Sequence, residues 1–167
     1  MIKHIPNAIT SLNLLCGGVA ILFTVSGDLI IAAIFVFLGI FFDFFDGLAA
    51  RLLHAQSEVG VQFDSLADVV TCGVVPSLVM VQLLQVSMYH EIRPLTDIFS
   101  ARAWQTGIDS YFPLIGLLIL VASAYRLAKF NVDTRQTTSF IGLPTPANAL
   151  FILSLPMIFE FQYSHMI

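Results

Sequence analysis

Residues 29–53 read LIIAAIFVFLGIFFDFFDGLAARLL, an apolar run long enough to cross a bilayer as one α-helix. Four comparable runs lie at residues 8–26, 59–86, 112–130 and 143–163. A backbone exposed to lipid must satisfy its own hydrogen bonds, so each run is expected to be helical. The sequence therefore predicts an all-α, polytopic membrane helix bundle with five spanning helices.

The composition agrees with a membrane protein. Hydrophobic residues make up 57% of the 167 residues and charged residues only 11%, whereas about a quarter of a soluble domain is charged. Five spans leave little chain for a soluble unit, so one domain over residues 1–167 is expected. The first run is too long for a cleaved signal peptide and should remain as a helix. The net charge of −4 gives no reason to expect a nucleic-acid partner.

The basic residues predict the orientation of the bundle. With the N-terminus inside the cell, the inner side receives Lys3, Arg51, Arg126, Lys129 and Arg135, and the outer side receives Arg93 and Arg102. Excess Lys and Arg mark cytoplasmic loops, so the N-terminus and the turn after residue 53 should face the cytoplasm. The polar interval 87–110, with Trp104 as a membrane-interface anchor, is interpreted as an outer loop.

Residues 43–68 carry the chemistry-bearing side chains. Their sequence, DFFDGLAARLLHAQSEVGVQFDSLAD, places Asp43 and Asp46 near the end of one apolar helix and Asp64 and Asp68 near the start of the next. Residues three or four apart share a helix face, so antiparallel packing can bring all four carboxylates around one volume. Their mutual repulsion would be severe without protons or cations.

Oxygen ligands without nearby cysteine or imidazole favour hard cations. Mg²⁺ or Mn²⁺, with two ions at the site, is therefore expected. An inert set of helix-end acids is the bland alternative, but four ionisable residues in spanning segments favour a functional site. A divalent-cation transporter is the alternative from another class. The acids gather at one membrane face, which favours an interfacial site with access to lipid headgroups. Cys16 and Cys72 lie in apolar runs without metal-ligand spacing and are interpreted as core residues.

The same window fits the pattern DxxDGxxARx(8)GxxxDxxxD at every fixed position. These positions are Asp43, Asp46, Gly47, Ala50, Arg51, Gly60, Asp64 and Asp68. The chain thereby resembles the CDP-alcohol phosphotransferase family over nearly its whole length. IPNAIT at 5–10, Asn13, YRLAKFN at 125–131 and FIGLPTPA at 140–147 make it most similar to the bacterial phosphatidylserine synthases of that family.

The resemblance implies a phosphatidyl transfer from CDP-diacylglycerol to the hydroxyl of L-serine, with release of CMP. It implies that all four aspartates bind metal and that Asp68 also takes the proton of the attacking hydroxyl. The residues implied to bind the CDP-lipid are Asp43, Asp46, Gly47, Ala50, Arg51, Gly60 and Asn13. Another acceptor, such as glycerol phosphate or inositol phosphate, stays open.

Arg126 and Asn131 are candidates for binding the acceptor, because a guanidinium can pair with the serine carboxylate and an amide can hydrogen-bond it. Ordinary positive-inside charge is the alternative for Arg126. Similar proteins pair as homodimers and usually have six or more membrane helices. A homodimer in the bacterial cytoplasmic membrane, and a chain truncated after its fifth helix, are therefore expected from the resemblance.

Overall fold

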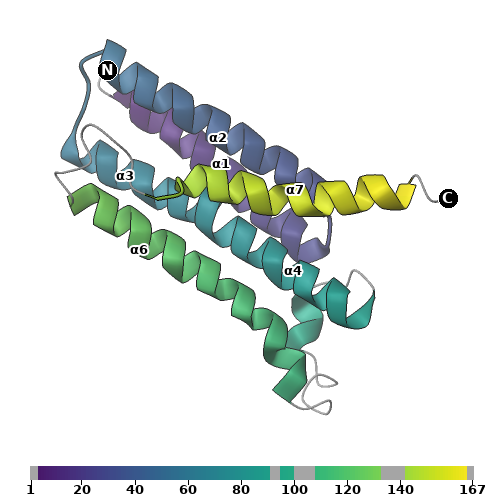
Figure 1. The fold of residues 1–167 in the computed structure, drawn as a ribbon. Coiled ribbons are helices and arrows are strands. Elements are labelled where there is room, and N and C mark those ends of the chain that lie inside the picture. The colour runs from purple at the N-terminus through teal and green to yellow at the C-terminus, as the bar shows by residue number, and fades with distance from the viewer. Residues whose placement is uncertain (1–3, 91–94, 100–107, 133–141, 165–167) are drawn as a thin grey trace.

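The computed structural model describes residues 4–90, 95–99, 108–132 and 142–164, and Figure 1 shows it as a bundle of long helices. Every regular element in these ranges is helical. In chain order they are α1 (Ile5–Ser26), α2 (Leu29–Leu52), α3 (Glu58–Asp68), the π-helical turn η2 (Val69–Val74), α4 (Val75–Tyr89), the 3₁₀ helices η3 (Leu95–Phe99) and η4 (Ile108–Leu117), α6 (Leu118–Val132) and α7 (Thr145–Ser164).

Within the described ranges, four helical rods are long and apolar enough to cross a membrane: Ile5–Ser26, Leu29–Leu52, Glu58–Tyr89 and Tyr111–Val132. The fifth rod, α7, is apolar over the shorter stretch Thr145–Phe161. Large apolar side chains such as Leu22, Phe112 and Phe151 are exposed on the outside of the bundle, where lipid would cover them. The prediction of an all-α, polytopic membrane bundle is confirmed, and the chain is an integral membrane protein.

Helices α1 and α2 form an antiparallel pair that packs along its length (Figure 1). Gly27 ends α1 with a φ of 90°, a left-handed conformation that glycine adopts without strain. Asp28 then caps α2, because its side chain accepts a hydrogen bond of 3.2 Å from the Ile31 N–H. This tight turn fixes the two helices as neighbours.

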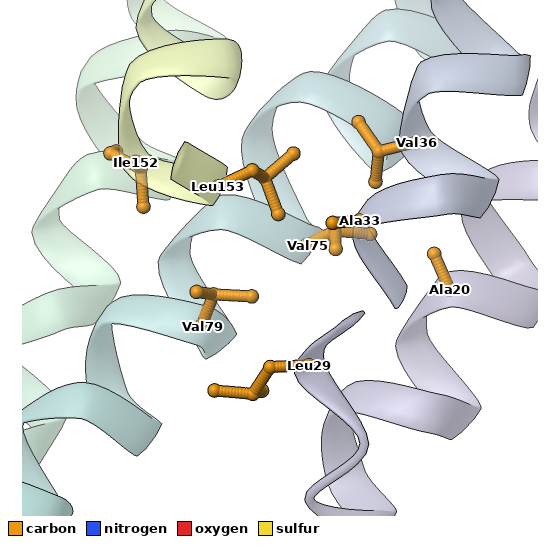
Figure 2. Close-up of a cluster of buried hydrophobic side chains, with 8 residues drawn as sticks. All are labelled: Ala20, Leu29, Ala33, Val36, Val75, Val79, Ile152 and Leu153. Carbon is orange, nitrogen blue, oxygen red and sulfur yellow. The ribbon is translucent and has the colours of Figure 1, made fainter. Parts of the chain in front are cut away.

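A cluster of buried side chains joins four helices in the middle of the bundle (Figure 2). Its members come from α1, α2, α4 and α7 and are Ala20, Leu29, Ala33, Val36, Val75, Val79, Ile152 and Leu153. Two of the contributors from α1 and α2 are alanines, and small residues let membrane helices approach closely. The cluster holds α4 against the α1–α2 pair and thereby fixes where α3, its N-terminal continuation, lies.

The rod from Glu58 to Tyr89 is continuous, but it is not a uniform α-helix. Immediately after Asp68 it widens into the π-helical turn η2, where the Val75 N–H bonds to the Val70 carbonyl five residues earlier. Pro76 explains the widening, because it has no N–H for the carbonyl of Cys72 and its ring crowds that carbonyl in a regular α-helix. The sequence predicts one uninterrupted helix here, so the π turn is an addition from the structure.

The fourth rod also differs from its prediction of residues 112–130. It begins as the 3₁₀ helix η4, which contains Pro113, and its α-helical part α6 extends to Val132. The prediction of an outer loop over residues 87–110 is wrong at both ends, because residues 87–89 belong to α4 and residues 108–110 belong to η4. Between them the structure describes His90 and η3. Trp104, Arg93 and Arg102 of that loop, together with Lys3 and Arg135, lie outside the described residues.

Candidate active site

The four predicted carboxylates meet between the second half of α2 and the second half of α3. Asp43 and Asp46 project from one face of α2, and Asp64 and Asp68 project from one face of α3. Asp46 is the most deeply buried, with 4% of its surface exposed, and the other three are half-buried. The helical spacing therefore brings the four groups together as the sequence predicts.

Three of these carboxylates form a compact group. One oxygen each of Asp43, Asp46 and Asp64 lies within 4.8 Å of the other two. The fourth carboxylate, that of Asp68, lies beside Asp43. Asp46 Oδ2 and Asp64 Oδ1 are buried and accept no hydrogen bond from the part of the chain that the structure describes. Buried anionic oxygens without donors fit a hard divalent cation such as Mg²⁺ or Mn²⁺, which prefers oxygen ligands.

A hydrogen-bond chain that is buried at Asn13 and Thr71 ends at Asp68. Asn13 Nδ2 lies 3.5 Å from Asp68 Oδ1, and the Thr71 hydroxyl donates to Asn13 Oδ1 over 2.8 Å. Asn13 and Thr71 are both fully buried. Asn13 contacts Asp68 and does not line the cavity, described next, that opens beside the carboxylates. Its predicted contact with the CDP-lipid therefore stays a prediction.

A cavity of about 460 Å³ opens beside the carboxylates, a size within the usual range for small-molecule sites. It lies between the start of α1, the end of α2 and the start of α3. Its lining residues are Pro6, Asn7, Thr10, Gly47, Ala50, Ala55, Gln56, Ser57, Glu58, Gly60, Val61 and Asp64. The three small residues that the family resemblance implies in CDP-lipid binding, Gly47, Ala50 and Gly60, thus line one cavity together with a metal-ligand candidate, Asp64.

Gly60 and Gly47 shape this cavity differently. A Cβ at Gly60 would stand 3.0 Å from Ser57 Oγ and 3.2 Å from Asn7 Oδ1, so the backbone there approaches its neighbours closely. A Cβ at Gly47 would meet only Arg51 Nη2, at 3.6 Å. Arg51 itself is exposed and folds back on its own helix, where its Nε donates to the Gly47 carbonyl over 3.1 Å. It stands at the rim of the site.

The two acceptor candidates on α6 bind different neighbours. Arg126 Nη1 donates to the hydroxyl of Thr145, at the start of α7, over 2.8 Å. The Asn131 amide exchanges hydrogen bonds of 2.8 and 3.2 Å with the hydroxyl of Ser65. Because Ser65 follows Asp64 directly, Asn131 lies close to the carboxylate group, whereas Arg126 ties α6 to α7.

Sequence reasoning missed several polar residues of this site. Thr71 and Ser65 contact site residues directly, and Thr10 lies beside the Asp46 carboxylate. One signal could have found two of them: Thr71 is three positions after Asp68 and Thr10 is three before Asn13, the spacing of side chains on one helix face. A polar residue inside an apolar span is costly, as an acid is, and is therefore a candidate for a functional site.

A larger cavity, of about 800 Å³, lies at the opposite end of the bundle. It is lined by the α1–α2 turn, the end of α4 and the later part of α7, with Asp28, His90 and Glu160 among its residues. The group of three carboxylates lies at the other end, so cavity size alone does not locate the chemistry.

Comparisons with known proteins agree with the motif. The sequence profile described as CDP-alcohol phosphatidyltransferase matches residues 3–167. The chain is 34% identical over 157 residues to the CDP-diacylglycerol–serine O-phosphatidyltransferase of Bacillus subtilis, covering 92% of this chain and 75% of that protein.

Two further relatives are longer than this chain. A protein of the same name from Helicobacter pylori is 32% identical over 154 residues, covering 89% of this chain and 55% of that protein. An archaetidylserine synthase of Methanothermobacter thermautotrophicus is 30% identical over 155 residues, covering 90% of this chain and 56% of the relative. No solved structure was found to match the chain. From the motif, the four gathered carboxylates and the profile match over residues 3–167, the chain belongs to the CDP-alcohol phosphatidyltransferase family.

Proposed function

We propose that this chain transfers the phosphatidyl group of CDP-diacylglycerol to the hydroxyl of L-serine and releases CMP. The observation that carries the proposal is the group formed by Asp43, Asp46 and Asp64 beside a cavity lined by Gly47, Ala50 and Gly60. An anion-binding cation next to a cavity for a nucleotide suits a CDP-activated substrate. The choice of serine as acceptor is supported by the names of the relatives.

Asp43, Asp46, Asp64 and Asp68 would hold the divalent metal, Mg²⁺ or Mn²⁺, as two ions. When bound, such ions polarise the phosphoryl groups and neutralise the charge that develops as CMP departs. The four carboxylates are half-buried or buried, so water screens their charges less than it would at an open surface. That environment strengthens the attraction between the carboxylates and a cation.

Asp68 is proposed as the general base. A new bond forms between the serine hydroxyl oxygen and the phosphorus of the phosphatidyl group, while the bond from that phosphorus to the CMP oxygen breaks. The hydroxyl proton passes to the Asp68 carboxylate, and the electron pair of the broken bond leaves with CMP. A carboxylate within hydrogen-bond reach of the attacking hydroxyl is the group that this transfer needs.

The cavity would take the nucleotide part of the donor lipid. Gly47, Ala50 and Gly60 leave room for the cytidine and its phosphates at the ends of α2 and α3. Arg51, which stands at the rim, can turn from the Gly47 carbonyl to a phosphate oxygen and form a charge-assisted hydrogen bond there.

The acceptor is proposed to bind between α3 and α6. Asn131 supports this placement, because it is hydrogen-bonded to Ser65 directly beside Asp64. Arg126 lies five residues before Asn131 on α6, about one and a half helical turns, and would pair with the serine carboxylate. Its hydrogen bond to Thr145 uses one guanidinium nitrogen, and a guanidinium offers five N–H donors.

We also propose that residues 1–167 act as a single domain whose catalytic end faces the cytoplasm in a bacterial cytoplasmic membrane. Arg51, Arg126 and Lys129 support this orientation, because all three stand near the carboxylate end of the described bundle. Assembly as a homodimer is proposed from the resemblance to similar proteins.

The test is product analysis with purified protein in detergent. CDP-diacylglycerol, labelled L-serine and Mg²⁺ or Mn²⁺ are supplied, and label in the lipid phase is measured. We expect labelled phosphatidylserine, lost with chelator and with Asp68→Asn. Asp28→Asn is the matched control, since Asp28 is an exposed aspartate that caps α2 at the far end of the bundle, and it should retain activity.

The same assay separates the alternatives. Product from glycerol phosphate or inositol phosphate, but none from serine, would keep the phosphatidyl transfer and overturn the serine assignment. Absence of product from every alcohol, in protein that remains folded and binds Mn²⁺, would contradict the proposed enzyme.

A further inference from the structure

We propose that Thr71 is a positioning residue for Asp68, acting through Asn13. The inference deepens the proposed function and rests on it only for the role of Asp68 as general base and metal ligand. Its basis is the hydrogen-bond chain that runs from the π turn η2, through α1, to the carboxylate at the end of α3.

The link from Thr71 to Asn13 is buried, and the link from Asn13 to Asp68 is partly buried. The Thr71 hydroxyl lies 2.8 Å from Asn13 Oδ1 and 3.3 Å from the Asn13 main-chain oxygen, so both of its neighbours are acceptors. Asn13 Nδ2 lies 3.5 Å from Asp68 Oδ1, at the long end of the hydrogen-bond range. Asn13 and Thr71 have no exposed surface, so water does not compete for these groups.

The chemistry of the three groups fixes the Asn13 amide in one orientation. An ionised carboxylate only accepts hydrogen bonds, so the amide nitrogen must face Asp68. The amide oxygen then points away from Asp68 and needs a donor of its own, which the Thr71 hydroxyl supplies. Without that hydroxyl, the buried amide oxygen loses its donor, and the amide is freer to turn its oxygen toward the carboxylate.

The packing around Thr71 leaves the side chain little freedom. A Cβ at Gly17 would stand 2.5 Å from Thr71 Oγ1, and a Cβ at Gly39 would stand 2.7 Å from Thr71 Cγ2 and 2.9 Å from Asn13 Oδ1. Thr71 is thus packed tightly against Gly17 of α1 and Gly39 of α2. Gly39 also packs against the amide oxygen of Asn13. Thr71 is three residues after Asp68 and lies in the π turn η2, which packs against α1.

The experiment compares Thr71→Val, which removes the hydroxyl but keeps the shape, with Thr71→Ser, which keeps the hydroxyl. Thr24→Val is the matched control, because Thr24 is also fully buried but its hydroxyl bonds only within α1, to the Ala20 carbonyl. The measurements are kcat, KM for CDP-diacylglycerol, Mn²⁺ binding without substrate and thermal unfolding. Thr71→Ala is a second variant without the hydroxyl in case Thr71→Val unfolds.

We expect Thr71→Val to lower kcat and weaken Mn²⁺ binding, each by roughly 10- to 100-fold, as is typical when a group that orients a metal ligand is lost. With Mn²⁺ supplied at a concentration that saturates the variant, KM for CDP-diacylglycerol should change less than about twofold, because the nucleotide cavity does not include Thr71. Thr71→Ser should restore both quantities, and Thr24→Val should alter neither. In an Asn13→Ala background, Thr71→Val should cause little further loss, since the two residues act in one chain.

Wild-type kcat and Mn²⁺ affinity in folded Thr71→Val or Thr71→Ala would overturn the inference, even where the unaltered protein makes phosphatidylserine. An equal loss with and without Asn13 would overturn the route through Asn13. Conversely, if the protein makes no phosphatidylserine but Mn²⁺ binding weakens in Thr71→Val and recovers in Thr71→Ser, the positioning role stands and the serine assignment fails.

Discussion

Asp46 is expected to favour metal binding at the expense of the stability of the metal-free fold. It is buried, one of its oxygens lacks a hydrogen-bond donor among the described residues, and it stands within 4.8 Å of two other carboxylate oxygens. Such an arrangement is unfavourable for the metal-free fold, because like charges repel most strongly where water is excluded. A bound divalent cation would turn the same arrangement into an attractive one.

Asp46→Asn is therefore expected to stabilise the metal-free protein while weakening its metal binding. Removing one negative charge from the group should raise the free energy of unfolding by on the order of 1 kcal/mol. Thermal unfolding in detergent, with chelator and then with Mn²⁺, measures both effects. At a Mn²⁺ concentration a hundred times Kd the unaltered protein should gain about 2.7 kcal/mol, and the variant should gain less. A variant that is less stable with chelator and gains as much from Mn²⁺ would contradict the metal-site assignment.

Arg126 offers a prediction about the acceptor. Arg126→Lys keeps the charge but replaces a planar guanidinium, which can pair with a carboxylate through two hydrogen bonds, with a point charge. We expect KM for L-serine to rise roughly tenfold, equivalent to about 1.4 kcal/mol, while KM for CDP-diacylglycerol stays unchanged. Lys129→Gln on the same helix is the control. An equal rise in both KM values, or a rise only in Lys129→Gln, would argue against Arg126 as an acceptor ligand.

At the scale of the helices, close packing of α1 on the π turn depends on Gly17. An alanine Cβ there would stand 2.5 Å from Thr71 Oγ1 and 3.2 Å from the Thr71 backbone, so Gly17→Ala should destabilise the fold by about 1–3 kcal/mol. Gly18 is the matched control, because a Cβ there would meet nothing within 4 Å. Gly18→Ala should stabilise α1 by about 0.5–1 kcal/mol, as alanine favours a helix interior. Thermal unfolding decides, and similar effects from both substitutions would contradict the described packing of α1.

The helices were predictable from sequence because the bilayer imposes long apolar runs, and Gly27 with Asp28 marks a turn by its local chemistry. The π turn was not predictable, because Pro76 indicates that one helical hydrogen bond is lost but not which conformation the neighbouring turns adopt. The four aspartates were predictable because ionisable residues inside apolar runs are conspicuous. The contacts of Thr71 and Ser65 were not predictable, because single hydroxyl residues are common in membrane helices. Their partners, Asn13 and Asn131, are also distant in sequence.

Across the whole molecule, the chemistry is confined to one end. The start of α1, the turn between α2 and α3 and the end of α6 lie at one end of the bundle (Figure 1), which is the end that carries the carboxylates. The start of α7 is hydrogen-bonded to α6 through Arg126. The α1–α2 turn and the end of α4 form the opposite end, where the larger cavity lies. A substrate with a water-soluble nucleotide and two acyl chains suits a site at one membrane face, since its headgroup and its tails need different surroundings.

At the scale of the whole molecule, the prediction concerns which end of the bundle faces the cytoplasm. Cys16 and Cys72 are 8% and 1% exposed, so a membrane-impermeant maleimide should label the unaltered chain weakly. Ser26→Cys places a thiol on the exposed α1–α2 turn, and Gln56→Cys places one on the exposed turn between α2 and α3. Because the basic residues predict that the carboxylate end faces the cytoplasm, intact bacterial cells should label at position 26, and position 56 should react only after permeabilisation. The reverse pattern would put the carboxylate end outside the cell and would contradict the predicted orientation.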